Sequence, residues 1–148
     1  MFVPFVMGTT FFSFWASSVT PVTPHTEGLV VYFYNITPHK GPIYVAIYND
    51  ANSFLNEQKA LEKKVVPITN GTNISTYFPN LGQGTYAISC YQDLNNNGKL
   101  DKNLLGIPSE PYGFSNNVRP KFRAASWQES RFYIKDQQNN ISLRLEKW

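Results

Sequence analysis

The chain consists mainly of short segments of two kinds. In some, apolar and polar residues alternate; in others, apolar residues follow one another without interruption. Ile43–Tyr48 and Thr85–Tyr91 alternate with a period of two, which predicts β-strands. Leu29–Ile36 is apolar at nearly every position, as expected of a strand covered on both faces. Shorter strands are predicted at 63–69, 73–78, 131–135 and 141–145. About seven strands separated by turns every 8–12 residues are typical of an all-β, antiparallel β-sandwich.

Two features of the pattern concern connections between the strands. Leu29–Ile36 and Ile43–Tyr48 are joined by a turn with two prolines and a glycine, so we expect them to pair as an antiparallel hairpin. Around Ser53–Glu62 the spacing predicts a short helix or an ordered loop. The segment Leu104–Asn117, rich in glycine, proline and aromatic residues, is predicted to be a long ordered loop after the central strand Thr85–Tyr91. Loops of this kind often carry function.

The N-terminal segment differs in character from the rest of the chain. Phe2–Ala16 is apolar and uncharged, and small residues follow it up to Ser18. This pattern predicts a signal peptide over residues 1–18, a Pro/Thr spacer over 19–27 and one β-sandwich domain over 28–148. No basic residue precedes the apolar run, so a core strand or a retained anchor stays open as an alternative. We expect a secreted or periplasmic protein with no stable membrane span after signal removal.

Composition and charge narrow the classes of function. The formal net charge is only +3 in 148 residues, and the Lys and Arg residues are scattered rather than clustered. This distribution argues against nucleic acid as a partner. The single cysteine, Cys90, cannot form an intramolecular disulfide and lies within a predicted strand. We therefore interpret it as a buried apolar side chain rather than a reactive thiol.

The polar stretch that follows the central strand has the spacing of a cation-binding loop. Asp93, Asn95 and Asn97 occupy alternate positions, so their side-chain oxygens can converge on one point. Gly98 permits a sharp reversal, after which Lys99 would contribute its carbonyl oxygen and Asp101 a carboxylate. Because every donor is oxygen, Ca²⁺ is favoured over zinc or copper. With two carboxylates and two amides we expect weak binding, with a dissociation constant of about 10⁻⁴–10⁻³ M.

This loop is not an EF-hand. Position twelve, where an EF-hand supplies a bidentate carboxylate, is Leu104, and the loop follows a strand instead of a helix. A second interpretation stays open: the stretch is a plain turn in which Asp and Asn side chains cap their own backbone amides.

The motifs of this region resemble those of the bacterial DUF2141 family. The pattern of that family has four parts in this order: Tyr-Ala-Ile/Val, a His-Asp-x-Asn-x-Asn-Gly-Lys-Leu-Asp loop, Gly-Ile-Pro-x-Glu and Tyr-Gly-Phe-Ser-Asn. The corresponding segments here are Tyr86–Ile88, Asp93–Asp101, Gly106–Glu110 and Tyr112–Asn116. The resemblance extends over Gly28–Glu146 and implies an extracytoplasmic β-sandwich of immunoglobulin-like or prealbumin-like type, with no established activity. Gln92 stands where the family usually has His, and Ala124–Trp127 replaces its usual Pro-Pro-Ser-Phe.

Two further groups of residues are candidates for chemistry or binding. Glu110 could pair with Asp93 or Asp101 in the manner of glycosidase carboxylates, although acids near a cation loop are more often ligands or caps. The strand tyrosines could form a sugar- or peptide-binding face, although cross-strand packing is the more common role; they are Tyr32, Tyr34, Tyr44 and Tyr48.

These observations lead to a main hypothesis and an alternative. The main hypothesis is a non-enzymatic extracytoplasmic β-sandwich in which a weak Ca²⁺ loop orders an interaction surface for a ligand or protein, with a cell-envelope glycan among the candidate partners. The alternative is an extracytoplasmic enzyme that acts on a glycan or small ligand through Glu110 with Asp93 or Asp101. A purely structural domain without an ion also stays open.

Overall fold

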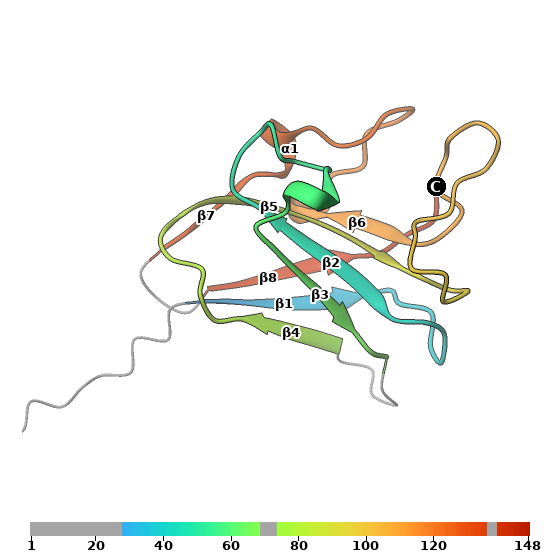
Figure 1. The fold of residues 1–148 in the computed structure, drawn as a ribbon, viewed down its shortest axis with the longest axis horizontal. Helices are drawn as coiled ribbons and strands as arrows, with labels where there is room; N and C mark the ends of the chain where they lie inside the picture. Colours follow the sequence, from blue (N-terminus) through green and yellow to red (C-terminus); the bar gives the residue numbers. More distant parts are fainter. Residues whose placement is uncertain (1–27, 69–73, 136–138) are drawn as a thin grey trace, which may run out of the picture.

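The computed structural model describes residues 28–68, 74–135 and 139–148. These residues form an all-β, sandwich-like fold in which eight strands make two sheets (Figure 1). The predicted fold class is therefore confirmed, while its immunoglobulin-like or prealbumin-like character stays a prediction. The predicted signal peptide and spacer lie outside the described residues. The strands are β1 (Leu29–Tyr34), β2 (Ile43–Tyr48), β3 (Glu62–Val66), β4 (Ile74–Phe78), β5 (Gly84–Gln92), β6 (Tyr112–Phe114), β7 (Phe132–Ile134) and β8 (Asn139–Arg144).

The sheet order corrects two expectations. One sheet has the order β4-β1-β8 and the other the order β3-β2-β5-β6, with β7 also paired to β5. The strands β1 and β2 are not a hairpin, because β1 pairs with β4 and β8 while β2 pairs with β3 and β5. The sandwich is also not wholly antiparallel, since β1 and β8 run parallel.

The connection between β1 and β2 carries the chain from one sheet to the other. At its start, Asn35 adopts φ of 59° and its side-chain amide donates to the carbonyl of Leu145 at 2.7 Å, just beyond β8. In the middle, Thr37 is bonded through its backbone to the side chain of Gln92 at the end of β5. Partners from both sheets therefore hold this connection, which explains why strands adjacent in sequence are not adjacent in space.

The core lies between the two sheets and follows the alternation of the strands. Leu29, Val31 and Phe33 of β1 are buried, while Tyr32 and Tyr34 face outward. Burial of such large apolar side chains stabilises the fold by about 1.5–3 kcal/mol each. The other core residues are Ile43, Val45, Ile47, Val66, Ile74, Phe78, Leu81, Tyr86, Ile88, Cys90, Ile134, Leu143 and Leu145.

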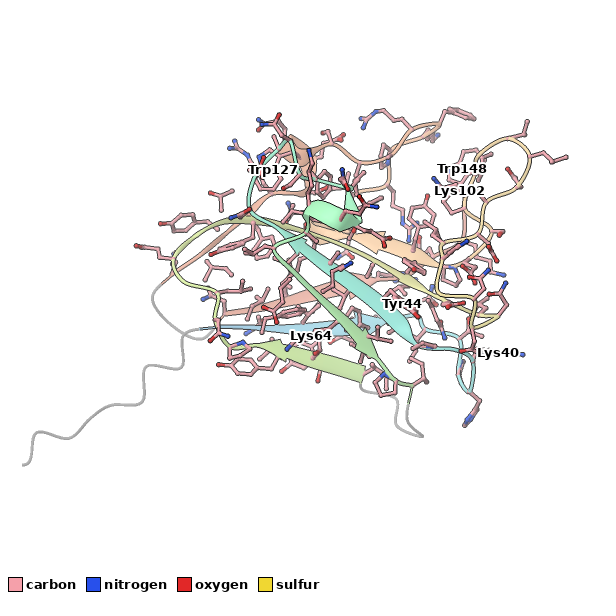
Figure 2. The ribbon with its side chains drawn as sticks, viewed as in Figure 1. Lys40, Tyr44, Lys64, Lys102, Trp127 and Trp148 are labelled. Carbon is pink, nitrogen blue, oxygen red and sulfur yellow. The ribbon has the colours of Figure 1, made fainter. Side chains whose placement is uncertain are left out.

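The outer face of the larger sheet is partly covered by an aromatic cluster. The ring of Phe54 contacts Tyr48 of β2, Phe114 of β6 and Trp127, with centroid distances of 5.4, 6.4 and 6.0 Å. Trp127, labelled in Figure 2, begins the helix α1 (Trp127–Ser130). The start of this helix is a capping box between Ser126 and Glu129. Ala87 of β5, which points away from the core, is also buried and is the register partner of Tyr48 in this cluster.

Several short elements differ from the prediction. The expected helix or ordered loop at Ser53–Glu62 is an ordered loop containing one 3-10 turn, η1 (Glu57–Lys59). The segment Leu104–Asn117 is not entirely loop, because it contains β6 and the 3-10 turn η2 (Ser115–Asn117). Three-residue elements are too short to produce a recognisable period in the sequence. No helix in the described part of the chain is long and apolar enough to cross a bilayer.

A close backbone contact joins the β1–β2 connection to the polar loop after β5. The backbone amide of Asp93 donates to the carbonyl of Pro42 at 3.0 Å. A Cβ atom added to the neighbouring Gly41 would lie 1.8 Å from the carbonyl oxygen of Asp93. Only glycine fits this approach without backbone movement.

We predict that Gly41→Ala lowers the free energy of unfolding by about 1–3 kcal/mol, since the added methyl group overlaps a backbone atom. Urea denaturation of both proteins measures the difference. Gly82→Ala is the matched control, because a Cβ there would meet nothing within 4 Å. Equal loss of stability in both variants would contradict the predicted contact.

Candidate functional site

The polar loop Asp93–Asp101 begins where β5 ends and is organised around the side chain of Asp93. Asp93 is fully buried, and its two carboxylate oxygens accept hydrogen bonds from the backbone amides of Asn97 at 3.1 Å and Gly98 at 2.7 Å. Asn96 and Gly98 adopt positive φ angles of 60° and 75°, which close the loop back on this carboxylate. The carboxylate therefore acts as the internal template of the loop.

Three of the predicted ligand side chains converge on the outer side of the same loop. Asn95 donates through its amide nitrogen to Asp101 at 2.6 Å, and Asn97 donates to both oxygens of the same carboxylate at 2.9 and 3.0 Å. The side-chain oxygens of Asn95 and Asn97 accept from the backbone amides of Asn97 and Lys99. The loop thus brings Asn95, Asn97 and Asp101 together, whereas the carboxylate of Asp93 is bonded to the backbone amides of Asn97 and Gly98. The ligand set itself stays a prediction.

The donor set is compatible with a hard cation after one rearrangement. The amide groups of Asn95 and Asn97 present nitrogen to Asp101, so each must turn about its terminal bond before its oxygen can face an ion. Asp93, Asn95, Asn97, Asp101 and the carbonyl of Lys99 would then supply only oxygen atoms, the ligands that Ca²⁺ prefers. The hydrogen bonds described above also satisfy the loop internally, as the plain-turn interpretation expects. In the described part of the chain, no three His, Cys, Asp or Glu side chains form a metal cluster.

Glu110 ties this loop to the segment that follows it. Its carboxylate is buried, and its two oxygens accept from the backbone amides of Leu94 at 2.8 Å and Asp101 at 3.1 Å. Leu94 and Asp101 lie near the two ends of the loop, so one side chain closes it. The sequence predicts that Glu110 is either a ligand or cap of the loop or a member of a catalytic pair. Nothing in the local pattern indicates which backbone amides lie next to a residue nine positions downstream of Asp101.

This arrangement does not favour the catalytic pairing of Glu110 with Asp93 or Asp101. Both oxygens of Glu110 and both oxygens of Asp93 are held by backbone amides, and both side chains are buried. A general acid or base must reach the substrate directly or through one water molecule. The contacts of these carboxylates are those of structural caps.

Gln92, where the resembled family usually has His, joins three segments of the chain. It is fully buried; its amide oxygen accepts from the backbone amide of Thr37 at 2.7 Å, and its amide nitrogen donates to the carbonyl of Thr37 at 2.7 Å. Its own backbone amide donates to the carbonyl of Pro111 at 2.9 Å. Gln92 therefore uses both the donor and the acceptor of an amide side chain, which fixes the loop entrance against the β1–β2 connection.

The strand tyrosines do not form one face. Tyr32 and Tyr34 point outward from the smaller sheet, whereas Tyr44 and Tyr48 lie on the outer side of the larger one, where Tyr48 is fully buried. The ring of Tyr44 stacks on Tyr91 at 5.1 Å with planes 4° apart. Of the two interpretations, cross-strand packing describes Tyr44, which is paired with Tyr91 on β5 and also lines a groove, while Tyr48 packs on Phe54 in the loop after β2.

The groove lies on the outer face of the larger sheet and touches the polar loop. Its volume is about 280 Å³, and its lining residues are Tyr44, Val45, Ala46, Glu57, Lys63, Lys64, Val65, Ser89, Tyr91 and Gly98. The hydroxyl of Tyr91 donates to the carbonyl of Gly98 at 3.3 Å. Burial, followed by the negative charge of Glu57, raises the pKa of Tyr91 well above its ordinary value, so this hydroxyl stays a neutral donor. The carboxylates of Asp93, Asp101 and Glu110 do not line this groove.

Cys90 has the environment expected of a core residue. Its side chain is buried in the core cluster, and the sulfur contacts the carbonyl of Gly113 at 3.6 Å. Burial raises the pKa of the thiol to about 12. These observations agree with the interpretation of Cys90 as a buried apolar side chain.

We predict that Glu110→Gln lowers the free energy of unfolding by about 1–3 kcal/mol. The amide replaces one acceptor oxygen by an NH₂ group, which leaves the backbone amide of Leu94 or Asp101 facing another donor. Chemical denaturation measures the loss. Glu57→Gln, at an exposed position, is the control and should change stability by less than about 0.5 kcal/mol. A Glu110→Gln protein as stable as this control would contradict the structural role of Glu110.

We also predict that Cys90 in the folded protein does not react with a thiol-specific reagent at pH 8. A pKa of about 12 leaves on the order of one thiol in ten thousand ionised at that pH, and the sulfur is buried. Labelling with Ellman's reagent in buffer and in guanidinium chloride checks this: one thiol per chain should react only after unfolding. Rapid labelling of the native protein would show that Cys90 is accessible.

Comparison with known proteins adds one finding to this geometry. No match was found among curated proteins or among solved structures. Residues 31–142, well over half of the chain, match the model of a family described as uncharacterized protein conserved in bacteria (DUF2141). The match includes β2–β7, the polar loop and Glu110, and it confirms the resemblance seen in the motifs of residues 86–116. The chain belongs to the DUF2141 family.

Proposed function

We propose that this chain is an extracytoplasmic, non-enzymatic β-sandwich module. Its loop Asp93–Asp101 binds Ca²⁺ weakly. The loop holds the following segment, Leu104–Asn117, in one shape for interaction with a partner. Secretion is inferred from the apolar, uncharged residues 2–16 and the small residues after them. The interaction role is inferred from how the loop and the segment are joined.

The observation that carries the proposal is the double hydrogen bond of Glu110. Its carboxylate joins Leu94 and Asp101 from a position inside the segment, so the loop cannot open without releasing the segment. The amide of Ser109 also donates to the carbonyl of Asp101 at 2.9 Å. An ion that stabilises the closed loop would therefore stabilise the segment as well.

The segment itself has the order that an interaction surface requires. Lys102 and Pro108 form an antiparallel bridge, and β6 adds to the edge of the larger sheet beside β5. The backbone amide of Tyr112 donates to the carbonyl of Glu146 at 3.0 Å, which attaches the segment to the C-terminal strand region. A surface held in this way loses little conformational entropy when it binds.

The alternative enzyme function receives less support. It requires Glu110 and Asp93 or Asp101 beside a substrate, yet Glu110 and Asp93 are buried and their oxygens are bonded to backbone amides. Only Asp101 is partly exposed, and its carboxylate accepts from two asparagines. For the partner of the module, a ligand, a protein or a cell-envelope glycan all remain candidates; the groove beside Tyr44 and Gly98 offers one place for a small glycan.

We predict that 5 mM Ca²⁺ raises the thermal midpoint of the full chain by several degrees relative to EGTA. For a dissociation constant of about 10⁻⁴–10⁻³ M, mass action at this concentration stabilises the folded state by about 1–2 kcal/mol. Differential scanning calorimetry at constant ionic strength measures the shift. An unchanged midpoint would overturn the calcium part of the proposal.

The same experiment with variants locates the ion. Asp101→Asn removes one of the two carboxylates of the loop and should abolish most of the shift. Asp50→Asn changes a carboxylate that caps Asn52 and Ser53 outside the loop, so the shift should persist whatever the stability of the variant. Equal shifts in both variants would place the calcium effect away from Asp93–Asp101.

A further inference from the structure

Two leucines at the tip of the Leu104–Asn117 segment are fully exposed. The relative accessibility is 106% for Leu104 and 83% for Leu105, the first being the highest of the large apolar side chains in the described part of the chain. In Figure 1 this tip is the yellow-orange loop that rises from the sheets near the C-terminus. Isolated apolar residues on a surface are ordinary, but two adjacent ones on a projecting tip are not.

The exposure of the tip is built into its backbone. The side-chain oxygen of Asn103 accepts from the amides of Leu105 at 2.9 Å and Ile107 at 3.1 Å. The amide of Gly106, with φ of 75°, donates to the carbonyl of Asn103 at 2.9 Å, and the amide of Asn103 donates to the carbonyl of Ile107 at 2.8 Å. Four hydrogen bonds close the turn, so the leucines cannot fold back without breaking it.

A second exposed apolar pair belongs to the same end of the molecule. Phe122 is 84% exposed and contacts the half-exposed ring of Trp148 at a centroid distance of 5.3 Å. Phe122 adopts φ of 61°, a conformation that a bulky residue rarely takes and that often accompanies function. Trp148 lies two residues after Glu146. Glu146 forms an antiparallel β-bridge with Tyr112, which lies two residues after Glu110. The loop between β5 and β6 and the loop between η2 and α1 rise to the same side in Figure 1. Figure 2 shows Lys102 and Trp148 on that side.

The charged groups at this end favour an anionic partner. Four lysines lie near the exposed apolar side chains in the sequence: Lys99, Lys102, Lys121 and Lys147. Within the described residues, their ammonium groups take part in no ion pair or hydrogen bond. The acidic groups nearby are engaged: Glu110 is buried, Glu146 pairs with Arg119 and Arg144, and Asp101 accepts from two asparagines. Uncompensated positive charge therefore lies close in sequence to each of the two exposed apolar pairs.

We infer that this end docks peripherally on an anionic lipid surface, with Leu104 and Leu105 inserted among the acyl chains and the lysines against the headgroups. Convex apolar side chains flanked by lysine suit a membrane interface, where apolar burial and attraction to anionic headgroups add together. Aromatic rings such as those of Phe122 and Trp148 favour the same interfacial level. A narrow tip offers little of the area that a stable protein interface buries. This inference rests on the proposed interaction role of the segment and assigns that segment a lipid surface in place of a protein or a glycan.

The test is flotation of the full chain with vesicles of phosphatidylcholine containing 30% phosphatidylglycerol, in EGTA, compared with vesicles of pure phosphatidylcholine. We expect at least fivefold more protein on the anionic vesicles. Leu104→Ser/Leu105→Ser should reduce that binding severalfold, and Lys99→Gln/Lys102→Gln should remove most of the preference for anionic lipid. The matched control is Leu55→Ser/Leu61→Ser, which removes two apolar side chains that are 37% and 49% exposed elsewhere and should bind like the wild type.

All variants carry the same residues 1–27, so binding through that segment is equal in all of them and only differences count. Equal flotation of the tip variant and the control, or equal flotation on both vesicles, would overturn the inference. Size-exclusion chromatography tests self-association. If the wild type is a dimer that the tip substitutions dissociate, and it does not bind lipid, the lipid inference is overturned in favour of self-association. Lipid binding in EGTA together with a melting midpoint insensitive to Ca²⁺ would sustain the lipid surface while refuting the calcium loop.

Discussion

The buried carboxylate of Glu110 is the interaction on which the candidate site depends. Because it accepts from the backbone amides of Leu94 and Asp101, a single side chain closes the polar loop and anchors the segment that leads away from it. A buried carboxyl group is tolerated only when hydrogen bonds replace those it made to water, and these two amides supply them. Removal of the carboxylate would therefore affect the loop, the projecting tip and the start of β6 together.

The same end of the larger sheet is held by a second buried polar side chain. Gln92 donates to and accepts from Thr37, while its backbone amide donates to Pro111. The loop thus has a firm base in the β1–β2 connection, where Gly41 allows the two backbones to approach. Both the donor and the acceptor of the Gln92 side chain are therefore used to fix the base of the loop.

The surface built on this base combines a rigid apolar tip with unpaired lysines. Its order arises from short-range hydrogen bonds of Asn103 and from the long-range contact of Glu110, whereas its chemistry is set by four exposed apolar side chains. The groove beside Tyr44 and Tyr91 touches the same loop through Gly98. The polar loop is consequently joined to both proposed recognition surfaces, and a change in its closure would affect both.

The sequence by itself determined the local elements: the alternation of β2 and β5, the burial of Cys90, and the convergence of Asn95, Asn97 and Asp101 all follow from spacing within a few residues. The tertiary structure alone decided the separation of β1 from β2, the parallel pairing of β1 with β8 and the capping role of Glu110. These features join residues that are distant in the chain, and no local period records which strand or amide will be the neighbour. The short strand β6 belongs with them, because three residues become a strand only through pairing with β5.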